Sequence, residues 1–225
     1  NVVNKAIAAS DSLALGFVMS GNRVQSDVDV IIGKGGATEV TFVEGGSVTI
    51  LGSDGATIEG EASVTSSSVG GPSFGGLLAR NAVQSTVDVA LTNAPVTATA
   101  GELSARAETT ATITATVSGL QPTPEAEEEG GDAPDGASFA LSGVIATNLI
   151  LSDANLTVTG GSLTAEGDLS VNAANAGTIT ATNQAEATGK GTAVGVSLAF
   201  NTIGWEAQNF LFGTVDAIIG TDIAA

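Results

Sequence analysis

Short segments of this chain recur at a long interval. Asn22–Val30 (NRVQSDVDV) returns as Asn81–Val89 (NAVQSTVDV), 59 residues further on. The alternating stretch Thr112–Thr116 returns in the same way as Thr178–Thr182. Recurrence of short β-prone segments is typical of solenoids, in which each unit stacks on the next. The repeat favours a scaffold or a binding surface over a compact catalytic domain.

The apolar residues are small. Hydrophobic residues make up 43% of the 225 positions, but aromatic residues make up only 4%, and 30 positions are glycine. A core built from Ala, Val, Ile and Leu is narrow, which suits stacked strands. The chain has no Cys and no His. It therefore has no disulfide framework and no thiol chemistry, and it lacks histidine, which is the commonest general base and metal ligand.

The formal net charge of −18 limits the partners that we expect. Nucleic acid and anionic membrane surfaces should repel such a chain, whereas divalent cations should be attracted. No apolar run is long enough to span a bilayer. The first residue is Asn1 and no signal peptide is visible. We therefore expect a processed product or a piece of a longer chain.

The repeats divide the chain into three and a half imperfect units of a single domain. They span about residues 3–68, 70–120, 137–187 and 191–225, and Val96–Ala105 matches Leu156–Ala165 at an offset of 60 residues. Between the second and third units lies a segment rich in Pro and acidic residues, 121–136. Its prolines and like charges oppose strand formation, so we expect a solvated loop inserted between coils.

Alternation within the units predicts strands. Ala111, Ile113 and Ala115 alternate with threonines, which places aliphatic and hydroxyl side chains on opposite faces. Strand-like segments return roughly every 17 to 23 residues, a spacing typical of one solenoid coil. We therefore predict an all-β parallel β-helix of about ten coils and about 50 Å. A β-sandwich is the alternative fold.

The segment Gly191–Asn201, followed by Thr214–Ile219, resembles the repeat of large exported bacterial proteins, the haemagglutinin-like and autotransporter-like adhesins. Leu156–Ala165 and Leu169–Ala173 fit the last part of that repeat. The third unit departs from it, because the Asn that follows the apolar opening is replaced around residues 140–144. The resemblance implies a right-handed parallel β-helix, secreted or bound to the cell surface, that acts in adhesion or as structural matrix.

Acidic residues are the candidate calcium ligands. Ca²⁺ takes six to eight oxygen ligands, and the candidates are Asp27, Asp29, Glu127, Glu129 and Asp132. The favoured interpretation needs no ion. The acidic segment is then a solvated loop, and several coils separate the repeated strand positions Asp29, Asp88 and Asp216, so that repulsion between them is weak.

Catalysis is not expected. The six basic residues are scattered, and no nucleophile elbow, phosphate loop or metal-ligand pair is present. Arg23 beside Asp27 and Asp29 is interpreted as part of a surface ion pair rather than as a polysaccharide-cleaving site. Rows such as Thr112, Thr114 and Thr116 raise ice binding as a rival, although threonine is also simply β-prone.

Trp205, Phe210 and Phe212 gather where the repeat is incomplete, and they either cap the solenoid or dock the next subunit. Uncapped solenoid ends present open strand edges and polymerise. The sequence thus predicts an extracellular, non-enzymatic structural or adhesive protein without a cofactor, which forms homo-oligomers or filaments through its ends. A module that binds surface carbohydrate or calcium is the second interpretation.

Overall fold

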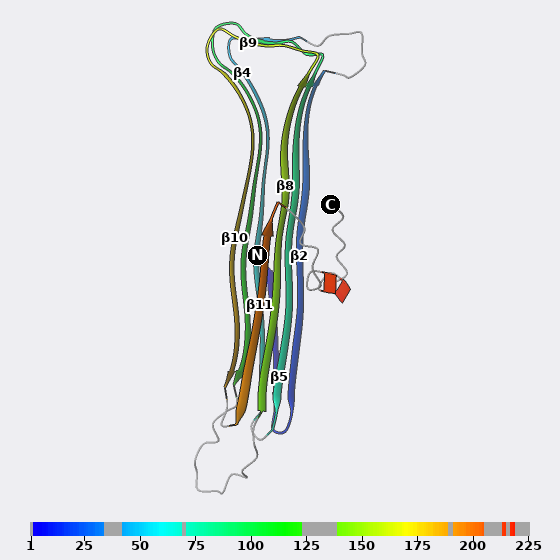
Figure 1. Cartoon of the computed structure of the whole chain (residues 1–225), viewed down its shortest axis with the longest axis vertical. Coiled ribbons are helices and arrows are strands. Elements are labelled where there is room, and N and C mark those ends of the chain that lie inside the picture. Colours follow the sequence, from blue (N-terminus) through cyan, green and yellow to red (C-terminus); the bar gives the residue numbers. More distant parts are fainter. Residues whose placement is uncertain are drawn as a thin grey trace.

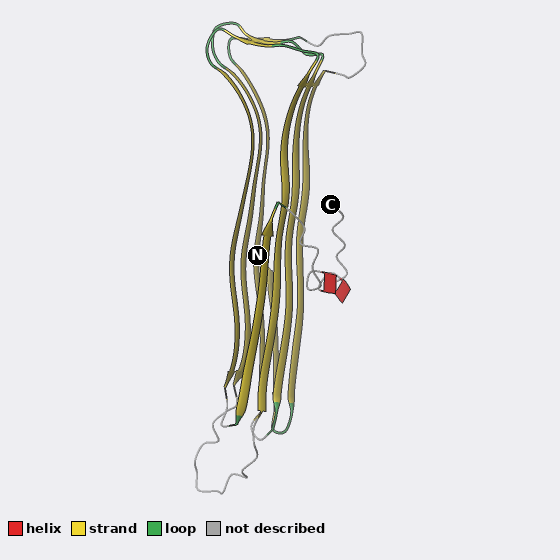
Figure 2. Cartoon of the chain, viewed as in Figure 1, coloured by secondary structure: helices red, strands yellow, loops and turns green. Residues whose placement is uncertain are grey.

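The computed structural model describes residues 2–33, 42–68, 71–122, 139–188, 191–204, 213–214 and 217–218. Within these ranges the chain forms the strands β1 to β11, and short helical turns lie at 213–214 and 217–218 (Figure 2). No helix in the described ranges is long and apolar enough to cross a membrane. The structure is therefore nearly all β.

The strands form three parallel sheets (Figure 1). Sheet A has the order β1 (Val2–Ser10), β4 (Val48–Ser68), β7 (Leu103–Pro122), β10 (Leu169–Thr188). Sheet B has the order β11 (Thr192–Ile203), β8 (Phe139–Thr159), β5 (Ser73–Thr92), β2 (Ala14–Gly33). The short sheet C contains β3 (Val43–Gly45), β6 (Val96–Ala98) and β9 (Leu163–Ala165). Every strand pair is parallel.

One coil passes along sheet B, across sheet C and back along sheet A (Figure 1). The long sheets face each other. On one side of every coil a strand of sheet A ends and the next strand of sheet B begins, as β4 is followed by β5, and we call this side the base. The predicted parallel solenoid is confirmed. The β-sandwich alternative shares the two facing sheets, but parallel pairing throughout and the connecting sheet C identify a solenoid.

The prediction of about ten coils is wrong, because the second and third predicted units each form a single coil. Asn81 lies beside Asn22 and Asn148, at sequence separations of 59 and 67 residues. Not every glycine marks a corner of a coil. Gly52 lies inside β4, where a Cβ would come within 2.7 Å of Val87 Cγ1 on sheet B. This glycine therefore permits close packing of the two sheets rather than a turn.

The core lies between the long sheets and follows the predicted alternation. Ala111, Ile113 and Ala115 of β7 are buried, whereas Thr114 and Thr116 are exposed. Side chains of both sheets join in one cluster that includes Val87, Val89 and Leu91 of β5, and Ala105 and Ala107 of β7. Small side chains thus fill a slim interior, as the composition predicts.

The chain leaves sheet B through a left-handed residue in the second and third coils. Asn93 has φ of 50° and Gly160 has φ of 65°. The backbone N–H of Asn93 donates to Thr159 O at 2.8 Å. Asn and Gly are the residues that adopt this conformation most readily, so these two positions turn the chain toward sheet C.

Candidate functional site

Four asparagines stack in one row through sheet B. Asn22 Nδ2 donates to Asn81 Oδ1, Asn81 Nδ2 donates to Asn148 Oδ1, and Asn148 Nδ2 donates to Asn201 Oδ1, each at 2.8 Å. We call this row the asparagine ladder. Its side chains point into the core between the sheets. The opposing Gly60 of sheet A makes room for it, because a Cβ there would lie 3.0 Å from Asn81 Oδ1.

The ladder has a direction. Every Nδ2 donates toward the C-terminal end of the solenoid, so Asn22 Oδ1 and Asn201 Nδ2 are left at opposite ends. Asn81 and Asn148 are 2% and 0% exposed, and the ladder bonds satisfy their buried amides. Asn201 is exposed, and its Nδ2 donates no hydrogen bond in the described ranges. The ladder therefore ends in a free donor.

Both ends of the solenoid carry open strand edges. Strand β2 is the outermost strand of sheet B at one end, and β10 is the outermost strand of sheet A at the other. Side chains of β11 that point toward the core axis, such as Ala193, Ser197 and Asn201, are exposed. No described residue covers these inward positions, so the end of the stack is open.

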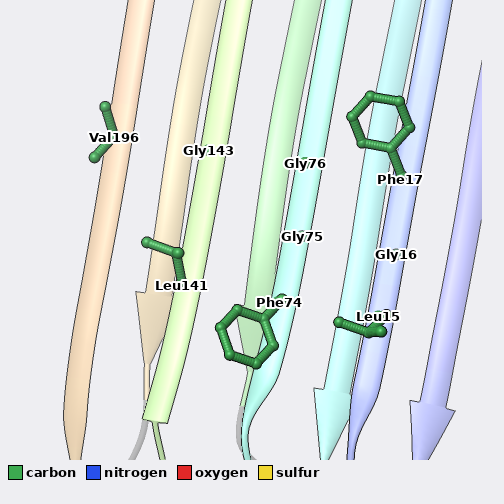
Figure 3. A pocket seen from close by; sticks show the side chains of 9 residues that line it. All are labelled: Leu15, Gly16, Phe17, Phe74, Gly75, Gly76, Leu141, Gly143 and Val196. Carbon is green, nitrogen blue, oxygen red and sulfur yellow. The ribbon is translucent and has the colours of Figure 1, made fainter.

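The outer face of sheet B carries an apolar groove near the base (Figure 3). The Cβ-free positions Gly76 and Gly143 leave a cavity of about 410 Å³ among larger side chains from four neighbouring strands. Those side chains are Leu15, Phe17, Phe74, Leu141 and Val196. Leu15 and Phe17 are 65% and 63% exposed, so this face is unusually apolar for a solvated surface.

Residues near the C-terminus lie on the same face. Thr214 and Ile218 line a second cavity of about 310 Å³, together with Phe17, Leu78, Ile145 and Leu198. Part of the apolar face is therefore already contacted by this chain itself. The apolar groove does not gather the polar groups that would orient a small substrate.

The predicted calcium ligands are only partly described. Asp27 and Asp29 lie on the outer face of β2, whereas Glu127, Glu129, Asp132 and Asp216 lie outside the described residues. Asp29 is level with Asp88 on the adjacent strand, and Asn155 Nδ2 donates to Asp88 Oδ1 at 3.0 Å. The interpretation that several coils separate Asp29 from Asp88 is thus wrong, because one coil takes the whole unit. No group of three acids that could hold a metal is found in the described part of the chain.

The other candidate residues are placed as follows. Arg23 Nη2 donates to Gln25 Oε1 at 2.9 Å and to Gln84 Oε1 at 3.5 Å. Trp205, Phe210 and Phe212, the predicted self-association residues, lie outside the described residues. The threonine rows Thr112–Thr116 and Thr178–Thr182 pair in register on the outer face of sheet A. The next strand interrupts this array, because Glu59 and Glu61 occupy two of its positions.

The asparagine ladder was missed from the sequence, although a signal was present. Asn22 and Asn81 stand at the same place in the recurring segments, and Asn201 ends the apolar opening of the last unit. The prediction that the third unit lacks this asparagine is wrong, because Asn148 takes its place and pairs with Asn81 and Asn201. Aligning every unit on its asparagine would have revealed the row.

Comparison with known proteins adds no family. No family model matches the chain, and neither a curated protein nor a solved structure does. The function must therefore be inferred from the described surfaces and from the sequence.

Proposed function

We propose that this chain is an extracellular structural or adhesive module that associates with copies of itself through the ends of its solenoid. One observation carries the proposal: β2 and β10 are outermost strands of 20 residues, and no further strand in the described ranges pairs with their outer edges. The extracellular setting rests on the resemblance to exported bacterial adhesin repeats. The absence of cysteine does not exclude export, since a chain without disulfides can also be secreted.

Open parallel edges favour association because a strand edge presents unpaired N–H and C=O groups. Natural proteins commonly protect such edges with inward-pointing charges, prolines or covering segments. The inward positions of β10, such as Val171, Ile179 and Ala181, carry neither a charge nor a proline. The next coil of another copy can therefore pair along it.

The net charge opposes this association. Each copy carries a formal charge of −18, so two copies repel at low ionic strength. Salt screens charges that lie farther apart than about 10 Å at 0.1 M ionic strength. Association is therefore expected to strengthen as salt is added.

Replacing Ala187 by lysine is expected to weaken self-association. Ala187 lies on the inward row of β10 close to the base, so the lysine would place a charge on the end of the stack. Thr182→Lys is the matched control, because Thr182 lies on the outer face of the same strand. Electron microscopy of negatively stained samples should show rods for the unchanged chain and the control, and short particles for Ala187→Lys. Equal rods for all three would contradict the proposal.

A second candidate function is ice binding. It is favoured by the in-register threonine rows on sheet A, where Thr112 pairs with Thr178 and Thr114 with Thr180. Strands lie about 4.8 Å apart and alternate residues about 6.6 Å apart along a strand, so these hydroxyls form a regular lattice. The array spans only two strands before Glu59 and Glu61 interrupt it. Thermal hysteresis in a solution of the purified chain would support this function, and its absence would remove it.

A further inference from the structure

We infer that a second copy of this chain adds head to tail, with Asn201 of one copy donating a hydrogen bond to Asn22 of the next. This inference rests on the proposed function, since it gives the partner, the direction and the register of self-association. It is carried by the direction of the asparagine ladder and by the shape of the two ends.

The ladder makes the two ends chemically different. At the C-terminal end, Asn201 Oδ1 accepts from Asn148 Nδ2, and Asn201 Nδ2 has no acceptor in the described ranges. At the N-terminal end, Asn22 uses Nδ2 to reach Asn81 Oδ1, which leaves Asn22 Oδ1 as the terminal acceptor. A donor meets an acceptor only when unlike ends join. Two like ends would bring two donors or two acceptors together.

The ends also match in shape. Strand β11 adds half a rung to sheet B, because it pairs only with Phe139–Ile150 at the base of β8. Strand β1 adds half a rung to sheet A, because it pairs only with Gly60–Ser68 at the base of β4. Both half-length strands therefore lie on the base side of their coils. One of them, β1, is at the N-terminal end of the stack, and the other, β11, is at the C-terminal end. When unlike ends join, β11 of one copy meets β2 of the next at the same level at which β1 meets β10.

The same register aligns the apolar outer face of sheet B. With Asn201 level with Asn22 of the next copy, Leu198 is level with Met19. Within one copy, Met19 already belongs to an apolar row with Leu78 and Ile145, and Leu198 ends that row. The apolar face thus continues across the joint without a polar interruption at this level.

Cysteine cross-linking tests direction and register, because the chain has no cysteine of its own. Leu198→Cys in one preparation and Met19→Cys in another would place the two thiols on neighbouring strands about 4.8 Å apart, within the range for a disulfide. Mild oxidation of the mixture should yield a cross-linked pair, and neither variant should cross-link alone. Leu15→Cys is the control for register, since it lies four residues, about 13 Å, from Met19 along the strand. Cross-linking of Met19→Cys alone, or equally of Leu15→Cys with Leu198→Cys, would overturn the inference.

The Asn201→Asp variant distinguishes the contribution of the asparagine ladder to association from the contribution of the open strand edges. The aspartate keeps an acceptor for Asn148 Nδ2 but loses the terminal donor, so association should weaken by about ten-fold or more. Asn172→Asp adds the same charge on the outer face of β10 and should associate like the unchanged chain. If Asn201→Asp associates like Asn172→Asp, the inference is overturned while the proposed function stands. If the unchanged chain does not associate, both are overturned.

Discussion

Replacing Ile113 by lysine is expected to unfold the chain, whereas the same substitution at the neighbouring Thr114 is expected to leave it folded. Ile113 is fully buried between the two long sheets, and Thr114 is exposed on the outer face of sheet A. An unpaired ammonium group in an apolar core costs well over 4 kcal/mol, which is comparable to the total stability of many domains of about 5–15 kcal/mol. Thr114 is level with Glu59, so a lysine there gains an acidic neighbour.

Circular dichroism during urea titration measures this difference. The Thr114→Lys chain should unfold within about 0.5 kcal/mol of the unchanged chain, as surface substitutions usually do. The Ile113→Lys chain should lack the strand signal even without urea. Similar midpoints for both variants would mean that Ile113 does not face a core, which would contradict the solenoid.

Replacing Asn148 by leucine is expected to destabilise the chain by about 1–3 kcal/mol, although the side chains are similar in size. The substitution leaves Asn81 Nδ2 without an acceptor and Asn201 Oδ1 without a donor. Asn81 is buried, so water does not replace its lost partner. Asn201→Asp is the control at the exposed end, because it keeps an acceptor for the buried Asn148 Nδ2, and it should cost clearly less.

The double variant Asn81→Leu with Asn148→Leu tests whether the ladder acts as a unit. It moves the broken bonds to Asn22 and Asn201, which lie at the ends of the row where water can reach them. Its loss in free energy of unfolding should therefore be smaller than the sum of the two single losses. Additive losses would show that the four amides do not depend on one another.

The fold class could be predicted from the sequence because alternation and repeats survive in it. The matches of Asn22–Val30 with Asn81–Val89 and of Thr112–Thr116 with Thr178–Thr182 are the registers that the strands adopt. The match of Val96 with Leu156 is wrong, since Val96 pairs with Leu163. Runs of Val, Thr and Ala fit one another at several shifts, so such segments alone do not determine register.

The size of a coil could not be predicted from glycine positions. A glycine is compatible both with a corner and with a close approach between sheets. Gly52 serves the second role, against Val87, and β4 continues through it. For the same reason the predicted separation of several coils between Asp29 and Asp88 is wrong, because the two residues lie on adjacent strands. The asparagine ladder can be recognised in the sequence only when all four asparagines are aligned. Asn148 follows Asn81 by 67 residues, whereas Asn81 follows Asn22 by 59, so a fixed repeat length does not lead to Asn148.

Sedimentation velocity over a range of chain concentrations and salt tests end-to-end association most directly. Open edges at both ends predict a series of species that are whole-number multiples of one chain. Their average size should grow with concentration and with added salt, and decrease in the Asn201→Asp chain. A single species with the mass of one chain, unchanged by concentration and salt, would contradict self-association through the solenoid ends.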